Sequence, residues 1–211
     1  EIVLVNLNDN FPEIITSQMS VNENSTEIGC ISHSDKDINI EAAFSCLFAI
    51  NPDGSISDLA YNGEISFSVS GENILINSAT GSLSFENAPD YEEKTTYTAT
   101  VSINDGKNTT SADITINVID LNDTAPVVTS SKSYSVKENQ SSAGAIQIFD
   151  PDTVNNPFTY TIDDTYEDGS MFAINSNGEL TFVSNPDYES KSSYKVKVTI
   201  NDGVFDVTEE F

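Results

Sequence analysis

The sequence predicts an all-β fold of two tandem β-sandwiches, each with seven strands in Greek-key order. Three observations predict it: long segments recur in the same order, apolar residues alternate with polar ones, and turn-forming dipeptides separate the alternating stretches. A chain of 211 residues is long enough for two domains of about 100 residues each. About seven short strands in that length are typical of a Greek-key sandwich.

The recurrence covers most of the chain and divides it into two repeats. The segment TGSLSFENAPDYEEKTTYTATVSINDG at 80–106 returns as NGELTFVSNPDYESKSSYKVKVTINDG at 177–203, which is an offset of 97 residues. An earlier pair, SVNENS at 20–25 and SVKENQ at 135–140, is offset by 115 residues. The two offsets differ by 18 residues, which places an insertion in the first repeat at about residues 38–63.

Alternation with a period of two predicts strands that bury one face. Apolar residues occupy every second position in 97–103, and the same pattern returns in 194–200. The ranges 114–118, 83–85 and 180–182 continue the pattern. Asp-Gly, Asn-Gly and Thr-Gly dipeptides stand between these stretches and predict the turns that connect the strands.

A linker segment, VIDLNDTAP at 118–126, has a shorter echo, VNLNDNFP, at 5–12. We therefore expect residues 1–12 to be the end of a preceding repeat with its linker. Residues 13–123 would form one repeat, and 124–211 would form a second repeat whose last strand is cut short. The chain is expected to be an excerpt from a longer array, because no signal peptide opens it and no stretch of about 20 apolar residues could span a membrane.

The insertion differs in composition from the rest of the first repeat. IEAAFSCLFAI at 40–50 is apolar and could form either a short helix or a strand packed over the sheet. Cys30 and Cys46 are the two cysteines, and they could form a disulfide in an oxidising compartment or remain buried thiols; the disulfide is favoured. NPDGSISD at 51–58 resembles part of a calcium loop but lacks its first acidic ligand and its final glutamate, so a plain turn is favoured.

The charge is strongly acidic, with 34 Asp and Glu against 8 Lys and Arg and a formal net charge of −26. This excludes a nucleic-acid partner and argues against docking on an anionic membrane, because both would repel the chain. Such a charge suits either a soluble surface or a set of cation sites. The acidic residues that recur lie at strand ends and turns: Glu23 and Glu138, Asp90 and Asp187, Glu92 and Glu189, Asp105 and Asp202. This placement favours cation sites, since Ca²⁺ takes six to eight oxygen ligands.

Together, these motifs resemble the cadherin repeat family. ENS and ENQ, DYE, DLNDTAP, DPD and NDG stand in the order typical of that family, and the match covers nearly the whole chain outside the insertion. The resemblance implies about three Ca²⁺ ions at the junction between consecutive repeats. The repeats are compact, and in this they look more like bacterial cadherin-like repeats than animal ones. This likeness suggests a large bacterial surface or secreted adhesin.

The same resemblance implies the ligands, with three residues contributing backbone carbonyls. The junction ligands would be Glu23, Asp90, Glu92, Asp120, Leu121, Asn122, Asp123, Thr124, Asp150, Asp152, Asn156 and Asp202. A weaker half-site, holding at most one ion, would comprise Asn8, Asp9, Asn10, Asp35, Asp37 and Asp105. Glu138, Asp187 and Glu189 would await a further linker.

We expect a calcium-dependent adhesion module outside the cell, in which Ca²⁺ stiffens the tandem array. Its partners would be neighbouring repeats of the same chain, with a polysaccharide or a cell-surface protein as the external partner. The alternative is a carbohydrate- or protein-binding module that uses Phe44, Phe48 or Tyr61 of the insertion. No enzyme is expected, because the single histidine, His33, is interpreted as an exposed bystander and the recurring carboxylates are accounted for as metal ligands.

Overall fold

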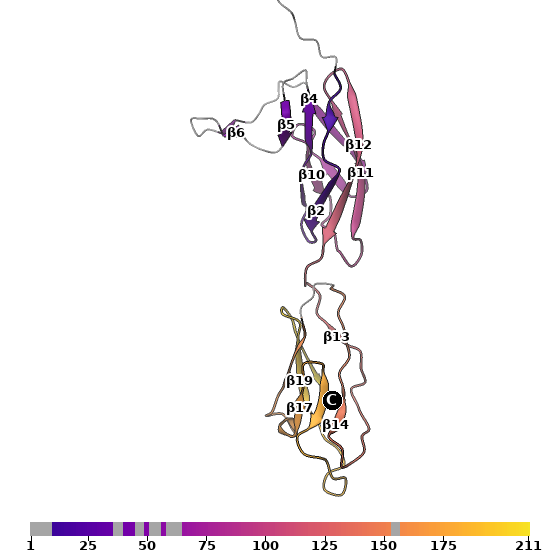
Figure 1. The fold of residues 1–211 in the computed structure, drawn as a ribbon, viewed down its shortest axis with the longest axis vertical. Coiled ribbons are helices and arrows are strands. Elements are labelled where there is room, and N and C mark those ends of the chain that lie inside the picture. Colours follow the sequence, from indigo (N-terminus) through magenta and orange to yellow (C-terminus); the bar gives the residue numbers. More distant parts are fainter. Residues whose placement is uncertain (1–9, 36–39, 45–48, 51–55, 58–64, 153–156) are drawn as a thin grey trace, which may run out of the picture. The chain divides into compact units, whose positions relative to one another are not determined.

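The computed structural model describes residues 10–35, 40–44, 49–50, 56–57, 65–152 and 157–211, and the side chains of 40–57 are outside that description. The chain divides into two compact units, Glu1–Asp120 and Leu121–Phe211 (Figure 1). Among the described elements, all are strands except one 3₁₀ helix, η1 (Gly169–Met171). Within the described ranges, no helix has the length and apolar character needed to cross a membrane.

The first unit places two sheets around one core. One sheet has the order β2 (Gln18–Asn22), β12 (Thr109–Ile119), β11 (Thr96–Asn104) and β8 (Ser66–Gly71). The second has the order β3 (Glu27–Cys30), β10 (Ser82–Phe85) and β9 (Ile74–Ile76). Shorter groups are β1 (Glu13–Ile14) with β4 (Ser32–Asp35) and β5 (Ile40–Phe44), and β6 (Ala49–Ile50) with β7 (Ile56–Ser57). β2 pairs with β12 in parallel, whereas the other pairs are antiparallel.

The predicted alternation buries one face of each long strand in the first unit. Along β11 the even-numbered residues are more exposed, whereas Val101 and Ile103 are fully buried. Ile116 of β12 is also fully buried. Phe85 of the opposite sheet meets Tyr97 edge-to-face, with 4.8 Å between the ring centroids. The core therefore lies between the two sheets, as a period of two requires.

The insertion contributes strands in the part of it that the structure describes. β5 pairs antiparallel with β4, with Ser32 opposite Phe44 and His33 opposite Ala43. The described residues of 40–50 therefore form strands, which is one of the two predicted alternatives, and not a short helix. Cys30 is disulfide-bonded, but Cys46, its expected partner, lies outside the described residues, as do most of NPDGSISD and the side chains of Phe44, Phe48 and Tyr61.

The second unit repeats this plan with shorter strands. Its sheets are β14 (Ser142–Ala145), β18 (Glu179–Phe182) and β17 (Phe172–Ile174); β16 (Thr159–Ile162), β19 (Lys197–Asn201) and β20 (Asp206–Glu210); and β13 (Val127–Val128) with β15 (Ile148–Phe149). Val198 and Ile200 are fully buried, and Leu180 faces them from the other sheet. The rings of Phe172, Phe182 and Tyr194 pack against one another beside these residues.

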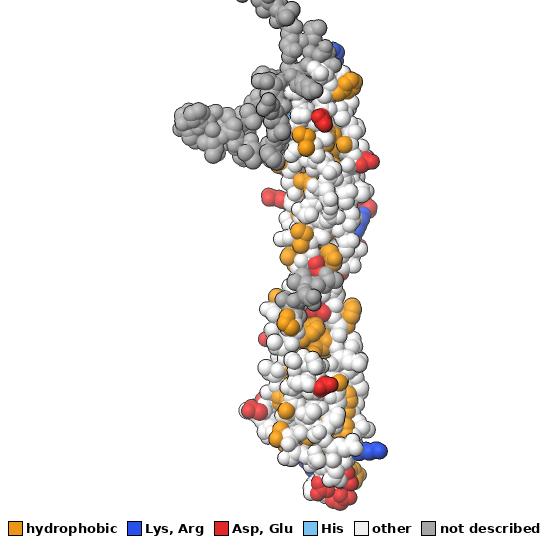
Figure 2. Space-filling view, viewed as in Figure 1, with side chains coloured by type: hydrophobic (Ala, Val, Ile, Leu, Met, Phe, Trp, Pro, Cys, Tyr) orange, Lys and Arg blue, Asp and Glu red, His pale blue; other side chains and the backbone are white. Residues whose placement is uncertain are grey.

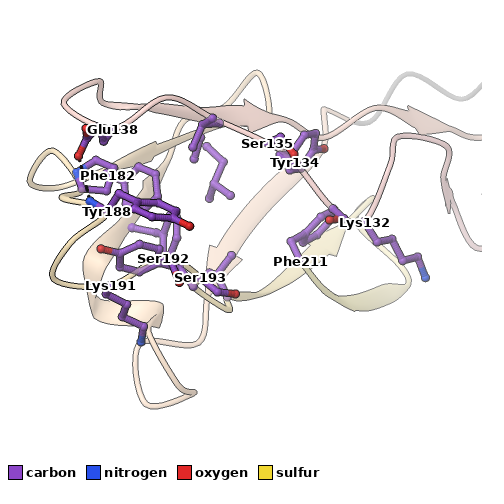
Figure 3. A pocket seen from close by; sticks show the side chains of 18 residues that line it. Lys132, Tyr134, Ser135, Glu138, Phe182, Tyr188, Lys191, Ser192, Ser193 and Phe211 are labelled. Atoms are coloured by element: carbon purple, nitrogen blue, oxygen red, sulfur yellow. Dashed lines mark hydrogen bonds between the residues drawn. The ribbon is translucent and has the colours of Figure 1, made fainter.

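One cavity has a volume of about 370 Å³ (Figure 3). It lies in the second unit between the segment 132–136 and Tyr194, with Phe211 at one side. In the first unit the matching segment is β2, which pairs with Thr115–Ile119 of β12. We do not interpret the cavity as a ligand site.

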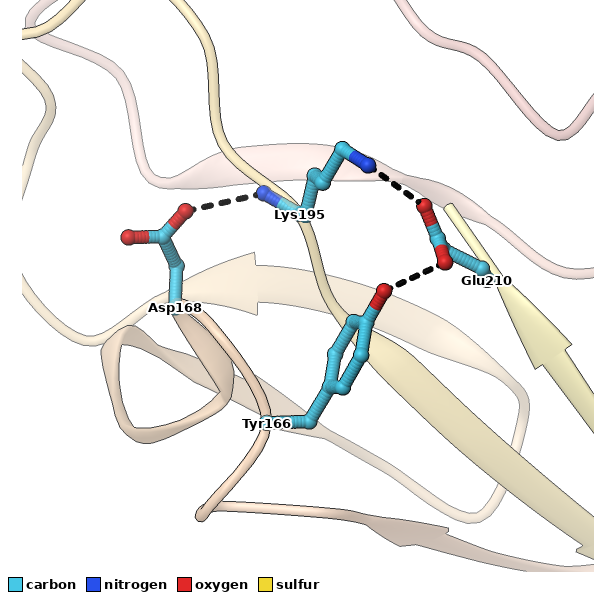
Figure 4. A network of polar contacts seen from close by, with 4 residues as sticks. All are labelled: Tyr166, Asp168, Lys195 and Glu210. Carbon is cyan, nitrogen blue, oxygen red and sulfur yellow. Dashed lines mark hydrogen bonds and ion pairs between the residues drawn. The ribbon is translucent and has the colours of Figure 1, made fainter.

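A polar network ties the loop before η1 to the last strand of the second unit (Figure 4). The Tyr166 hydroxyl donates to Glu210 Oε2, and Lys195 Nζ lies 2.9 Å from Glu210 Oε1. Asp168 Oδ2 accepts the Lys195 backbone N–H at 2.9 Å, and its Oδ1 pairs with Lys191. The hydrogen bond from Tyr166 lowers the pKa of Glu210, and the hydrogen bond from Lys191 lowers the pKa of Asp168.

Asp168→Asn is expected to destabilise the second unit in a pH-dependent way. A carboxylate whose folded-state pKa is depressed adds stability above its unfolded pKa, about 3.9, and loses it as pH falls through the folded value. At pH 7 the variant should be less stable by about 1 kcal/mol, or about 4–8 °C in melting temperature. The gap should narrow as pH falls below about 3.9 and through the depressed pKa of Asp168. Calorimetry checks this, with Asp164→Asn in the adjacent exposed turn as control, and a gap independent of pH would contradict it.

Candidate metal centre

Three carboxylates converge in the first unit, two from strand ends and one from a turn. Glu23 follows β2, Glu92 lies in the turn after β10, and Asp120 follows β12. One oxygen from each residue lies within 4.8 Å of the others. The Glu23 backbone N–H donates to Ile119 O at 3.1 Å, which fixes the ends of the parallel pair β2 and β12 side by side.

The DYE turn explains why Glu23 and Glu92 approach each other. Asp90 Oδ1 accepts the backbone N–H groups of Glu92 and Glu93 at 3.0 and 3.2 Å, so Asp90 caps its own turn. The Tyr91 N–H between them donates to Glu23 Oε2 at 2.8 Å. Asp90 therefore shapes the turn through Oδ1, and it is not among the three residues whose oxygens converge.

This convergence costs free energy unless a cation offsets it. Glu23 is 2% exposed, so its charge is largely withdrawn from water. Two like charges about 4 Å apart repel by about 1 kcal/mol in water and about 4 kcal/mol at an effective dielectric constant near 20. A hard divalent cation with oxygen ligands is the species that three such carboxylates suit.

A second group of oxygen ligands lies in the second unit, around the linker residues that begin it. Asp152 is 8% exposed and Asp202 is 1% exposed. The Thr124 N–H donates to Asp152 Oδ2 at 3.0 Å, and Asn122 Nδ2 donates to the Asp202 backbone carbonyl at 3.2 Å. The Asp152 N–H in turn donates to Asp150 Oδ1 at 3.1 Å. These contacts hold the linker against the DPD loop and the NDG turn of its own unit.

Three buried oxygens of this second group accept no hydrogen bond from the described residues: Asn122 Oδ1, Asp152 Oδ1 and Asp202 Oδ2. A buried acceptor without a partner costs about 1–3 kcal/mol, and more when it is charged. Oxygen atoms in that state suit a Ca²⁺ ion, which takes carboxylate and amide oxygens alike. The residues present therefore fit the metal that the sequence implies.

The two NDG turns share one backbone design. In each, the Asn side chain accepts the Gly N–H at 2.8 Å, and the Gly takes a left-handed φ of 90° in the first unit and 104° in the second. Asp202 Oδ1 accepts two backbone N–H groups, from Val204 at 2.8 Å and from Phe205 at 2.7 Å. Asp202 Oδ1 is thus bonded to the backbone of the turn, and Asp202 Oδ2 remains available to a ligand.

The turn of the first unit differs in one residue that sequence reasoning missed. Asn108 stands where the second repeat has Phe205, and its Nδ2 donates to Asp105 Oδ2 at 3.2 Å and to Asn10 O at 2.8 Å. Asp105 Oδ2 thus accepts a hydrogen bond from an amide, whereas the corresponding atom, Asp202 Oδ2, accepts none from the described residues. The alignment of NDGKN with NDGVF already carried this signal.

The other predicted ligands are distributed as follows. Asp35 and Asp105 of the expected half-site are buried at 2% and 1% exposure, and Asn10 is exposed. Asn8, Asp9, Asp37 and Asn156 lie outside the described residues. Leu121 is half-buried, whereas Asp123 and Thr124 are exposed and joined by a hydrogen bond of 3.2 Å between Thr124 Oγ1 and Asp123 Oδ1.

Glu138, Asp187 and Glu189 form a third convergent group, with oxygens within 4.8 Å of one another. It repeats the geometry of the first unit, since the Tyr188 N–H donates to Glu138 Oε2 at 3.0 Å. All three residues are exposed, and acidic side chains gather at the lower end of the second unit in Figure 2. A hydrogen bond from Ser190 lowers the pKa of Asp187.

His33 corrects the sequence interpretation, because it is buried at 3% exposure and is not an exposed bystander. The alternation of β4 explains the error: Ile31, His33 and Asp35 all face inward. The ring meets Phe67 edge-to-face at 5.2 Å between centroids. Burial lowers the pKa of His33, which favours the neutral imidazole.

Comparisons with known proteins agree on one family. Residues 132–209 match the model of the cadherin domain. Human Protocadherin Fat 4 is 35% identical over 154 residues, which is 67% of this chain and 3% of that protein. Mouse Protocadherin-15 is 30% identical over 135 residues, 61% of this chain and 7% of that protein. This chain thus spans only a small part of either relative.

Solved structures show the same fold. The crystal structure of human Protocadherin-24 EC1-2 has a TM-score of 0.65 at 18% identity, covering 95% of this chain and 92% of that one. Mouse Cadherin-23 EC22-24 also has a TM-score of 0.65, at 20% identity, covering 96% of this chain and 64% of that one. The predicted all-β tandem fold is confirmed.

The chain therefore consists of cadherin domains, two repeats in tandem, homologous to those of the protocadherins. Cadherin ectodomain repeats are extracellular, and the family comprises non-enzymatic adhesion proteins, so both of these expectations are confirmed. A bacterial origin is not supported, because the relatives come from human, mouse and chimpanzee. Compact repeats and polar turns do not distinguish the two sources.

Phe205→Asn is expected to weaken calcium binding at Asp202. The introduced amide would donate to Asp202 Oδ2, as Asn108 does to Asp105, and would compete with the ion for that oxygen. A competing hydrogen bond of about 1–1.5 kcal/mol lowers affinity by about 5–10-fold. Calorimetric Ca²⁺ titration checks this, with Phe205→Leu as an apolar control. Equal affinity in Phe205→Asn and the wild type would contradict the role given to Asp202 Oδ2.

Proposed function

We propose that this chain is a calcium-dependent adhesion segment in which Ca²⁺ stiffens the joint between its two repeats. The observation that carries the proposal is the convergence of Glu23, Glu92 and Asp120 within 4.8 Å, with Glu23 almost fully buried. The orphaned oxygens of Asn122, Asp152 and Asp202 support it from the second unit. Membership of the cadherin family supplies the identity of the ion, because cadherin repeats usually bind Ca²⁺ at their linkers.

The proposed site holds about three ions. The first unit would supply Glu23, Asp90, Glu92 and Asp120, and the linker and second unit would supply Leu121, Asn122, Asp123, Thr124, Asp150, Asp152, Asn156 and Asp202. Asp120, Asp123 and Glu92 would bridge two inner ions. Asn122, Asp150 and Asp202 would hold the outer one. When bound, Ca²⁺ would supply charge neutralisation and a fixed set of oxygen contacts.

The charge count explains how binding would control the joint. The ligand set contains eight carboxylates, at Glu23, Asp90, Glu92, Asp120, Asp123, Asp150, Asp152 and Asp202. Three Ca²⁺ ions would offset six of those charges. Without them the carboxylates repel one another, so the linker gains no stability from closing. Binding free energy then becomes stability of the joined repeats, and the array stiffens only where calcium is present.

We propose a weaker ion, at most one, near Asn10, Asp35 and Asp105. Asp105 Oδ2 already has the Asn108 amide beside it, so an ion there must displace or share that contact. The adhesive partner would be a surface protein or polysaccharide outside the cell.

Thermal melting in Ca²⁺ and in chelator tests the proposal. The wild type should melt at least about 10 °C higher in Ca²⁺, since a ligand at 100 times its dissociation constant adds about 2.7 kcal/mol per site. Asp123→Ala should lose most of this gain, because Asp123 would bridge two ions. Asp164→Ala removes the same charge from an exposed turn and should keep the gain. A wild-type melting temperature that ignores Ca²⁺ would rule the proposal out.

A further inference from the structure

Four Asn-x-Ser/Thr sequences occur in this extracellular chain, beginning at Asn24, Asn108, Asn122 and Asn139. This tripeptide is the acceptor for N-linked glycosylation, provided that the middle residue is not proline. The middle residues are Ser25, Thr109, Asp123 and Gln140, so all four qualify. The structure separates them by what each asparagine side chain already does.

Two of the four side chains are committed to the fold. Asn108 Nδ2 donates to Asp105 Oδ2 and to Asn10 O, which uses both of its N–H groups. Asn122 Nδ2 donates to the Asp202 carbonyl, and Asn122 Oδ1 is buried. A glycan on either nitrogen would replace an N–H and force a bulky sugar into a half-buried position. These two sequences are poor acceptors in the folded chain.

Asn139 has the opposite surroundings. It lies in the tight turn that follows the segment 132–137, with a left-handed φ of 60°. Every residue from 135 to 142 is exposed. The hydrogen bonds that the structure gives Asn139 run through its backbone: its N–H donates to Pro186 O at 2.9 Å, and its carbonyl accepts Asn185 Nδ2 at 3.1 Å. The turn is therefore held by the backbone, and the side-chain amide is presented to solvent.

Asn24 occupies the matching turn of the first repeat, with a φ of 62°, but in tighter surroundings. Glu23 before it is 2% exposed, and Ser25 after it is partly buried. The corresponding neighbours of Asn139, Glu138 and Gln140, are both exposed. Gln140, the middle residue of the Asn139 acceptor sequence, is thus more exposed than Ser25, the middle residue of the Asn24 sequence.

We propose that Asn139 carries an N-linked glycan. The co-reactant is an oligosaccharide joined through its first N-acetylglucosamine to a lipid diphosphate. Asn139 Nδ2 forms a bond to the anomeric carbon of that sugar and loses one proton, while the bond from the anomeric carbon to the diphosphate breaks and the lipid diphosphate leaves. The modification consumes no carboxylate, and it places a neutral glycan one residue from Glu138 in the third acidic group.

The test is site mapping on the full 211-residue chain secreted from animal cells. Release of glycans by an amidase in ¹⁸O water converts each occupied Asn to a labelled Asp, which peptide mass spectrometry locates. We expect label at Asn139 in more than half of the wild-type chains. Asn139→Gln and Ser141→Ala should abolish it. Ser142→Ala, which changes the adjacent exposed serine outside the acceptor sequence, should retain it.

Wild-type mapping needs no variant, so it stands even if a substitution impairs secretion. Unlabelled Asn139 in the secreted wild type overturns the proposal. Labelling at Asn108 or Asn122 equal to that at Asn139 overturns the structural argument for it. Neither result depends on Ca²⁺ binding, so this proposal and the proposed function fail separately.

Discussion

The arrangement depends most on the repulsion among carboxylates that the strand ends bring together. Parallel pairing of β2 and β12 ends with Glu23 beside Asp120, and the DYE turn adds Glu92 within 4.8 Å. Hydrogen bonds from the backbone N–H groups of Tyr91 and Glu23 hold the turn, Glu23 and the end of β12 together. Meanwhile Lys94, Lys191 and Lys195 pair with carboxylates elsewhere. A divalent cation is the natural way to offset such a group.

Repetition allowed much of this to be predicted from the sequence. A period of two placed Val101, Ile103 and Ile116 in the core. The acidic residues shared by the two copies were predicted to lie at strand ends and turns, where Glu23 and Asp120 follow strands and Glu92 lies in a turn. The Asp202-Gly203 dipeptide predicted the turn, in which the structure shows Asp202 Oδ1 accepting a backbone N–H. These features are local, and local rules predict them well.

Features that depend on packing between distant segments were harder to predict. The strand character of 40–44 depends on pairing with β4, which its apolar composition does not specify. His33 was expected to be an exposed bystander, yet the alternation of β4 turns its ring toward Phe67. The alignment of NDGKN with NDGVF marks Asn108 as a difference between the repeats, but only the structure shows its side chain beside Asp105 and Asn10.

The two repeats also show that one turn can surround its aspartate with different hydrogen-bond donors. Asp105 and Asp202 lie in the same kind of turn and are both buried. The amide of Asn108 donates to Asp105, whereas Phe205 takes the place of Asn108 near Asp202. The central claim, that calcium stiffens the joint, is tested most directly by small-angle X-ray scattering of the wild type in Ca²⁺ and in chelator. The account predicts a narrow distribution of distances with a sharp maximum dimension in Ca²⁺ and a broad one in chelator. Identical distributions in the two conditions would contradict it.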